Sequence, residues 1–336
     1  DEPETYRYKD MIGRIHQAAN LFHDLGIGSR EVVSYLLPSL PETHFTVWGA
    51  EATGIVNPVN YLLEPAQIVE ILNAAGTKCL VALGPTEGFD IWKKVLALRH
   101  DVPSLETILQ VRGDGEERDG VLDFSRQLEL YSVDRLVSGR CIAPDEPVGY
   151  FHTGGTTSAP KVVVQTHWNQ VYDVWIRALR TKVTAADTVI SAIPLFHANG
   201  FIVTTILPLV HGATIVLAGP TGFRNPDLVK DFWKVVERYR ATTFSAVPTM
   251  YSTLLNVPID GADVSSLRFA ACGAAPMPVE VFKSFERQTG LKIIEGYGLT
   301  EGTASSTANP IDGERRVGSV GLRHPYQQIQ PVEVLI

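Results

Sequence analysis

The sequence predicts an α/β fold made of two doubly wound, mainly parallel sheets flanked by helices. Short apolar, β-branched runs alternate with amphipathic segments of helix length, which is typical of parallel sheets covered by helices. This alternation occurs twice, on either side of a stretch rich in glycine and threonine. The length of 336 residues accommodates one large domain or two of ordinary size. We therefore expect a first lobe over residues 1–145 and a second over 146–336.

The first lobe is predicted to open with a helix. Apolar residues recur at helical spacing from Met11 to Leu25, and Gly26 follows as a stop signal. The segments after it alternate in predicted type: strand 31–37, helix 42–52, extended segment 55–60, helix 66–75 ended by Gly76, strand 78–83 and helix 89–98. The charged, glycine-containing stretch 112–120 is predicted to be a solvated loop.

Residues 150–167 read YFHTGGTTSAPKVVVQTH, which predicts a strand, a polar loop and a second strand. Glycines let the main chain approach a ligand closely, and successive backbone N–H groups form a concavity that binds anions. Hydroxyls and a lysine add donors suited to phosphate. The alternative is an ordinary solvated hairpin loop, and the composition favours phosphate binding. The residues concerned are Thr153, Gly154, Gly155, Thr156, Thr157 and Lys161.

This loop is not a Walker P-loop. That motif needs Gly-Lys-Ser/Thr at the start of a helix. Here Pro160 precedes Lys161, and Val162-Val163-Val164 continues as a strand. A phosphate loop of another kind is therefore predicted.

The second lobe repeats the alternation, with a helix at 169–181 and strands at 188–193, 213–217 and 267–270. The segment 194–200 (PLFHANG) closes the strand at 188–193, and open α/β sheets bind ligands just past the carboxyl ends of their strands. His197 lies in this segment, although a lone histidine is more often hydrogen-bonded and without a role in binding. The small residues of 271–276 (ACGAAP) allow the backbone to lie flat against a ligand, or simply to pack in a tight turn.

The most specific motif is 295–301, EGYGLTE. The ring of Tyr297 offers a flat face to a base, and Glu301 is a hard oxygen ligand of the kind that Mg²⁺ prefers. A tyrosine-glycine turn followed by a surface glutamate is common by itself. The occurrence of this motif after the three other segments, in this order, is uncommon.

In this order, the four segments resemble those of the acyl-adenylate-forming (AMP-binding) superfamily: acyl-CoA synthetases, luciferases and peptide-synthetase adenylation domains. The family's phosphate loop also ends in Pro-Lys, and Ser158-Ala159 here displace the glycine usual before that pair. Pro-Leu-Phe-His and Tyr-Gly-x-Thr-Glu motifs are matched directly. In the family's Gly-Gly-Ala-Pro-type segment, either Cys272 or Gly273 stands at the first glycine, depending on the register. The pattern is most similar to bacterial fatty-acid–CoA ligases.

The resemblance implies a role for each segment. The loop from Thr153 to Lys161 would hold the β- and γ-phosphates of ATP, and His197 would line the passage to the carboxylate substrate. Thr300 would contact the α-phosphate and Glu301 would hold Mg²⁺, so these two and His197 are the predicted catalytic residues. The remaining predicted nucleotide-binding residues are Gly273, Ala274, Ala275, Glu295, Gly296, Tyr297 and Gly298.

The implied reaction is the activation of a carboxylic acid by ATP to acyl-AMP, followed by transfer to coenzyme A. Neutral residues such as Ala198, Asn199 and Phe201 favour a fatty or other apolar acid. An adenylate-former with another acceptor, such as a carrier protein, and an inactive nucleotide-binding module remain as alternatives. The family's ribose-binding Thr-Gly-Asp segment and its C-terminal cap domain are absent from the sequence, so we expect an N-terminal fragment that binds nucleotide but is impaired in turnover.

Composition limits the possible partners, metal sites and cellular location of the protein. A net charge of −8 without a Lys/Arg cluster argues against nucleic-acid partners. Three cysteines without a CxxC motif suggest neither a disulfide framework nor a zinc site, and favour a cytoplasmic protein. The longest apolar run, near 201–210, is interrupted by Pro208 and is too short to span a bilayer. The sequence leaves the oligomeric state open.

Overall fold

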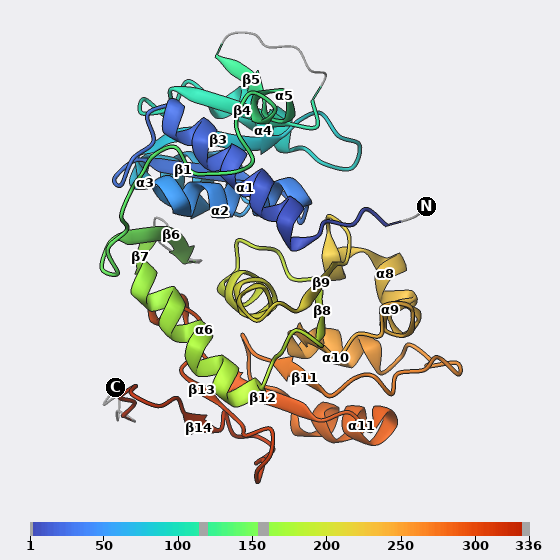
Figure 1. Ribbon diagram of the computed structural model, residues 1–336. Coiled ribbons are helices and arrows are strands. Elements are labelled where there is room, and N and C mark those ends of the chain that lie inside the picture. The colour runs from blue at the N-terminus through green and yellow to red at the C-terminus, as the bar shows by residue number, and fades with distance from the viewer. Residues whose placement is uncertain (1–2, 114–119, 154–160, 331–336) are drawn as a thin grey trace. The chain divides into compact units, whose positions relative to one another are not determined.

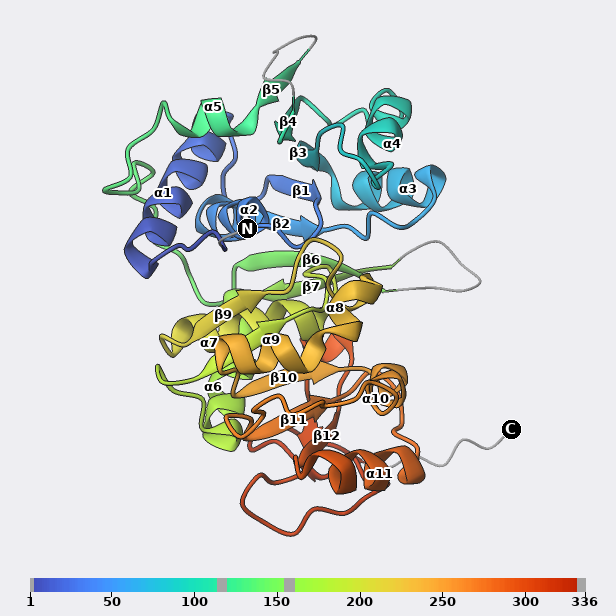
Figure 2. The same ribbon diagram turned by 90° about the vertical axis from the view of Figure 1, so that its right-hand side faces the viewer.

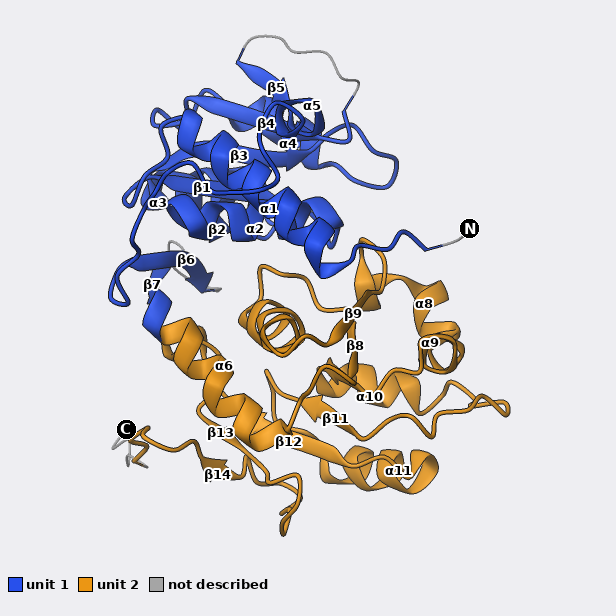
Figure 3. Ribbon diagram, in the orientation of Figure 1, with its two compact units in different colours: residues 1–168 blue, residues 169–336 orange. Residues whose placement is uncertain are grey.

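The computed structural model describes residues 3–113, 120–153 and 161–330 (Figure 1). Within them the chain forms two compact units, residues 1–168 (unit 1) and 169–336 (unit 2) (Figure 3). Each unit contains a seven-stranded, mainly parallel sheet flanked by helices, which confirms the predicted fold class.

The sheet of unit 1 has the strand order β5-β4-β3-β1-β2-β6-β7. Its neighbouring strands run parallel except for the antiparallel pair β6 and β7. The strands are β1 (Val32–Leu36), β2 (Ile55–Pro58), β3 (Thr77–Leu83), β4 (Thr107–Val111), β5 (Val121–Asp123), β6 (Pro147–Thr153) and β7 (Lys161–Thr166).

Helices cover both faces of this sheet, with α1 and α5 on one side of the central strands and α3 and α4 on the other (Figure 2). Helices α1 and α2 pack closely because Gly49 has no side chain, and a Cβ there would lie 2.7 Å from that of Ala18. Gly76 ends α3 in the left-handed region, at φ 67°, as the stop signal predicted. The helices are α1 (Tyr8–Asp24), α2 (Pro41–Thr53), α3 (Pro65–Ala75), α4 (Ile91–Leu98) and α5 (Phe124–Leu128).

The division between the units lies later in the chain than the boundary expected after residue 145. Strand β6 pairs with β2 through Val56 and Gly149, and β7 pairs with β6. The Asn57 side-chain amide also donates to the Tyr150 carbonyl oxygen at 2.6 Å. Both strands that flank the glycine-rich loop therefore extend the first sheet.

The sheet of unit 2 has the strand order β14-β13-β12-β11-β10-β8-β9. Its strands from β8 to β12 are parallel, whereas β13 and β14 add an antiparallel edge. The strands are β8 (Thr188–Ser191), β9 (Thr214–Leu217), β10 (Thr243–Ala246), β11 (Phe269–Cys272), β12 (Ile293–Tyr297), β13 (Thr307–Ala308) and β14 (Leu322–Arg323).

The second sheet is also accompanied by helices. They are α6 (His167–Thr181), α7 (Leu207–Val210), α8 (Pro226–Lys230), α9 (Phe232–Tyr239), α10 (Pro248–Leu254) and α11 (Val279–Thr289). A π-helical segment, η1 (Asn199–Ile206), precedes α7, and short 3₁₀ turns occur at η2 (Gly222–Arg224) and η3 (Thr300–Gly302). None of the helices in the described part of the chain combines the length and apolar character that crossing a bilayer requires.

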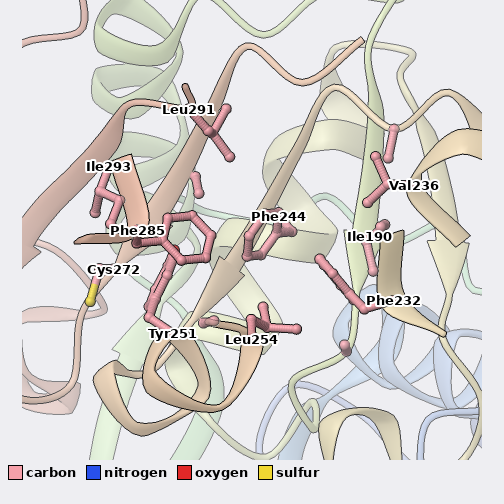
Figure 4. Close-up of a cluster of buried hydrophobic side chains, with 14 of the residues drawn as sticks. Ile190, Phe232, Val236, Phe244, Tyr251, Leu254, Cys272, Phe285, Leu291 and Ile293 are labelled. Atoms are coloured by element: carbon pink, nitrogen blue, oxygen red, sulfur yellow. The ribbon is translucent and has the colours of Figure 1, made fainter. Parts of the chain in front are cut away.

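One face of the second sheet is sealed by a buried aromatic cluster (Figure 4). The Phe232 and Phe244 rings meet edge to face with centroids 4.9 Å apart, as do those of Tyr251 and Phe285. The Tyr251 hydroxyl is satisfied because it donates to the Ala271 carbonyl oxygen at 2.7 Å. Burying each such ring contributes roughly 2–3 kcal/mol, so this face is a packed core and a ligand site must lie elsewhere.

Buried His44 predicts sensitivity of unit 1 to acid. Its side chain is 4% exposed in α2, and burial lowers its pKa from 6.5 to about 4. The unfolded chain therefore binds a proton between pH 6.5 and 4 that the folded chain does not, and stability falls as the pH falls through that window. The loss is about 1.4 kcal/mol per pH unit.

Urea unfolding at pH 7 and pH 5 measures this effect. We expect the loss of stability between these two pH values to be smaller in His44→Leu than in the wild type by about 2 kcal/mol. An unchanged pH dependence in the variant contradicts the assignment, whatever the variant's absolute stability.

Candidate active site

Three of the four predicted segments meet at the carboxyl edge of the second sheet. Segment 194–200 follows β8, segment 273–276 follows β11, and 297–301 continues from β12. These strands belong to one set of parallel neighbours, so their carboxyl ends share an edge. A cavity of about 340 Å³ opens there, within the usual range for ligand pockets. The predicted residues that line it are His197, Gly273, Ala274, Gly296, Tyr297, Gly298 and Thr300.

The floor of the cavity is the face of the sheet opposite the aromatic cluster. Side chains alternate between the two faces of a strand, so every second residue of these strands lines the cavity, and the residues between them pack into the core on the opposite face. The first set includes Val189, Ser245, Ala271 and Gly296. The second includes Ile190, Ala246, Ala270 and Ile293. Segment η1 contributes Val203 and Thr204 to the walls, and α6 contributes Arg177 and Thr181.

His197 reaches the cavity through a tight turn. Its backbone N–H donates to the Pro194 carbonyl oxygen at 3.1 Å, and the chain then folds back at Gly200. A Cβ on Gly200 would lie 2.4 Å from that same oxygen, so the return requires glycine. The imidazole packs on the Phe196 ring, with centroids 4.5 Å apart. Burial lowers the pKa of His197 below its ordinary 6.5, which keeps the ring neutral at pH 7.

The segment after β11 lies along the cavity, which Gly273 and Ala274 line. Ala274 adopts φ 71°, a left-handed conformation that is uncommon outside glycine. The Met277 N–H donates to Glu295 Oε1 at 2.9 Å, which ties the segment to β12. Gly273 is loosely surrounded, since a Cβ there would meet only the Gly296 carbonyl oxygen, at 3.7 Å.

Glu295 and Ala275 do not line the cavity in the described structure. Ala275 is exposed. Glu295 is 3% exposed, and its second oxygen, Oε2, has no hydrogen-bond partner among the described residues. A buried carboxylate oxygen without a donor is unusual in a folded protein. Glu295 therefore fixes this segment to β12 from the buried side and not from the cavity.

The segment 297–301 is shaped by close contact with the loop that follows it. Gly298 lies so near the Ala304 carbonyl that a Cβ would be 1.6 Å from its oxygen. The chain then makes the 3₁₀ turn η3, which begins with Thr300. Thr300 lines the cavity, the Tyr297 ring is about half exposed, and Glu301 is exposed outside the cavity lining.

The glycine-rich loop belongs to unit 1. Thr153 ends β6 and lies opposite Lys161, which begins β7 with an exposed side chain. Gly154, Gly155, Thr156 and Thr157 lie outside the described residues. The role of this loop in nucleotide binding stays a prediction.

Two residues by which α6 lines the cavity, Arg177 and Thr181, were not predicted from the sequence, and Arg177 is held by the buried Asp173. Asp173 is 1% exposed, and Arg177 Nε donates to its Oδ1 at 2.6 Å. The Ser305 N–H donates to Asp173 Oδ2 at 3.1 Å. The signal available was the four-residue spacing of an acid and a base in a predicted helix, which places both on one face.

The model of the AMP-binding enzyme family matches residues 1–334. The chain belongs to this family. Its curated relatives include a marinolic acid–CoA ligase of Pseudoalteromonas, 36% identical over 99% of this chain and 51% of the relative. A sulfoacetate–CoA ligase of Cupriavidus necator is 34% identical over 92% of this chain and 56% of the relative. The chain thus spans about half the length of these curated relatives.

Solved structures share the fold. The anthranilate CoA ligase AuaEII, solved in complex with anthranoyl-AMP, superposes with a TM-score of 0.84 at 21% identity, over 94% of this chain and 59% of that one. ATP-bound MatB from Rhodopseudomonas palustris has a TM-score of 0.80 at 23% identity, over 95% and 59%. At these identities the likeness supports the arrangement of the sheets and helices.

Proposed function

We propose that the chain forms the acid- and nucleotide-binding part of an enzyme that joins a carboxylic acid to coenzyme A through an acyl adenylate. One observation carries this proposal. The cavity on the second sheet is lined by predicted nucleotide-binding residues, among them Gly273, Ala274 and Tyr297, and by the predicted catalytic residues His197 and Thr300. The 36% identity to a CoA ligase over 99% of the chain also supports it.

The nucleotide is proposed to lie against the two segments that follow β11 and β12. The exposed face of Tyr297 offers a stacking surface for adenine. Gly273 and the left-handed Ala274 expose backbone toward the bound groups, and Thr300 supplies a hydroxyl for the α-phosphate.

The proposed reaction has two displacement steps. In the first, a carboxylate oxygen of the acid attacks the α-phosphorus of ATP, and the bond to pyrophosphate breaks. In the second, the sulfur of coenzyme A attacks the acyl carbon, AMP leaves, and the thiol proton is lost to solvent. The protein's contribution is positioning and charge stabilisation, and no protein nucleophile is required. A neutral His197 allows the acid to pass without trapping its carboxylate in an ion pair.

The residues beside the cavity are suited to binding a magnesium ion together with the phosphates of ATP. Mg²⁺ is usually bound by one or two carboxylates together with substrate phosphates, rather than by a complete protein cage. Glu301 is an exposed carboxylate one residue from Thr300, and no cluster of three acidic, histidine or cysteine side chains occurs within the described ranges. Glu301 would hold the ion, which when bound neutralises phosphate charge. Lys161 is proposed to neutralise the β- and γ-phosphates from the glycine-rich loop.

The substrate is proposed to be a fatty or other largely apolar acid. The cavity walls include Val189, Ile193, Val203, Leu207 and Phe269. Two of its polar residues, Asn199 and Ser245, satisfy each other, since Nδ2 of Asn199 donates to the Ser245 hydroxyl at 3.0 Å. Most of the wall thus favours an apolar tail.

The deciding experiment screens the full-length protein that contains this chain against carboxylic acids of varied length and aromaticity. Pyrophosphate release that depends on the acid supports the proposal, and absence of release with every acid overturns it. Adding coenzyme A or a carrier protein and following AMP release identifies the acceptor. The same screen with residues 1–336 alone tests impaired turnover, because full-length rates from this chain would contradict it.

Lys161→Ala is expected to weaken ATP binding by roughly tenfold or more while leaving AMP affinity nearly unchanged, because the lysine is assigned to phosphates that AMP lacks. Calorimetry with ATP and with AMP measures both affinities. Lys283→Ala, at an exposed position of α11, serves as the control for loss of a surface charge. Equal weakening of ATP and AMP contradicts the assignment, and so does an effect of the control as large as that of Lys161→Ala.

A further inference from the structure

The part of the cavity wall formed by α6 differs chemically from the rest of the wall. Among the described residues that line the cavity, Arg177 alone carries a formal charge at neutral pH. Its side chain is 14% exposed. An arginine that is largely removed from solvent is costly unless its donors are used. The hydrogen bonds of Arg177 within the protein therefore show which of its donors remain for a ligand.

The guanidinium is held from one side by its partner on the same helix. Arg177 Nε donates to Asp173 Oδ1, whereas Asp173 Oδ2 accepts from the Ser305 N–H. Both carboxylate oxygens of Asp173 are thus occupied. A guanidinium has five N–H donors, so pairing through Nε leaves its two terminal amino groups as further donors.

The other polar groups near this wall are already satisfied within the protein. The Ser305 hydroxyl donates to the Thr307 carbonyl oxygen at 3.1 Å. The Thr204 hydroxyl pairs with Ser191 and with the Gly200 carbonyl oxygen. The Thr181 hydroxyl donates to the Arg177 carbonyl oxygen at 3.0 Å. Among the described residues of the α6 wall, the hydrogen-bond donors that remain available therefore belong to Arg177.

The charge of this wall is balanced. Arg177 and Asp173 cancel each other. Burial, with the nearby Arg177, lowers the pKa of His324 to about 4, so that ring is neutral at pH 7. A second carboxylate on the substrate would bring an unpaired negative charge into the pocket, whereas a hydroxyl or carbonyl oxygen would accept a hydrogen bond without changing the net charge.

Resting on the function proposed above, we infer that Arg177 determines specificity by donating to an uncharged oxygen on the tail of the acid. The preferred substrate is then an apolar acid that carries a hydroxyl group beyond its carboxylate. A hydrogen bond from a charged donor discriminates by roughly tenfold or more against the analogue that lacks the oxygen. Asp173 acts through Arg177 as a positioning residue.

The test uses the full-length protein and pairs of acids that differ by one hydroxyl: hexanoate with 6-hydroxyhexanoate, octanoate with 8-hydroxyoctanoate, decanoate with 10-hydroxydecanoate, and phenylacetate with 4-hydroxyphenylacetate. Acid-dependent pyrophosphate release gives kcat/KM for each acid. We expect the hydroxy acid to be favoured by roughly tenfold or more in at least one pair. The ratio within a pair is the readout, because a general loss of activity cancels in it.

Two variants separate recognition from a purely structural role. Asp173→Asn together with Arg177→Met removes both charges and keeps an acceptor for Ser305, and we expect the ratio to fall to about one. Asp173→Asn alone leaves an uncompensated cation, so preference is expected to move toward the matching dicarboxylates. Equal ratios in the wild type and the double variant overturn the role of Arg177 and leave the proposed function intact. No release with any acid instead overturns the proposed function.

Discussion

Replacing Gly298 by alanine is expected to reduce acyl-adenylate formation by about 100-fold or more. A Cβ at this position would lie 1.6 Å from the Ala304 carbonyl oxygen, so the backbone of the 298–304 loop must move. That loop carries Thr300 and Glu301, and a displacement of roughly 1 Å in groups that position a reaction can cost about 100-fold in rate. Acid-dependent pyrophosphate release by the full-length protein measures the loss.

Gly273→Ala is the matched control for this prediction. A Cβ at Gly273 would meet only the Gly296 carbonyl oxygen, at an ordinary 3.7 Å, so the fold should accept it with little change in the unfolding midpoint. The same methyl group would project beside the cavity, and we expect weaker ATP binding with a normal fold. Near wild-type activity of Gly298→Ala would refute the argument. Unfolding of Gly273→Ala would show that its surroundings are tighter than the structure indicates.

Glu301→Gln is expected to slow acyl-adenylate formation by roughly 100- to 1,000-fold, since it weakens the binding of the magnesium ion that would neutralise phosphate charge in the transition state. The side chain is exposed, so stability should change by less than about 0.5 kcal/mol. Rates measured at several magnesium concentrations provide the readout. Partial recovery at high magnesium is expected, because an amide oxygen is a weaker ligand than a carboxylate.

Glu280→Gln is the control for Glu301→Gln, because Glu280 is an exposed carboxylate in the first turn of α11. It should leave both the rate and the magnesium dependence unchanged. If Glu301→Gln behaves like this control, the metal is bound elsewhere and Glu301 is an ordinary surface residue.

Local signals in the sequence were sufficient for most single elements. The strand predicted at 78–83 is β3 (Thr77–Leu83), and the helix predicted at 66–75 is α3 (Pro65–Ala75). Hydrophobic period, proline in the first turn and glycine at the end act within a few residues, so they can be read without knowing the rest of the fold. The helix predicted from 89 begins at Ile91, because Phe89 instead forms an isolated bridge with Thr86.

The sequence by itself determined the fold class, the family and the segments that contribute to the cavity, because short motifs and periodic patterns record local backbone requirements. Only the tertiary structure showed that β6 and β7 belong to the first sheet, and which face of the second sheet carries the cavity. It also showed that Glu295 is buried beside the segment after β11, and that Arg177 lines the cavity. These outcomes depend on contacts between residues far apart in the chain. Such contacts are selected by packing and by hydrogen-bond satisfaction across the whole unit, and no local pattern encodes them.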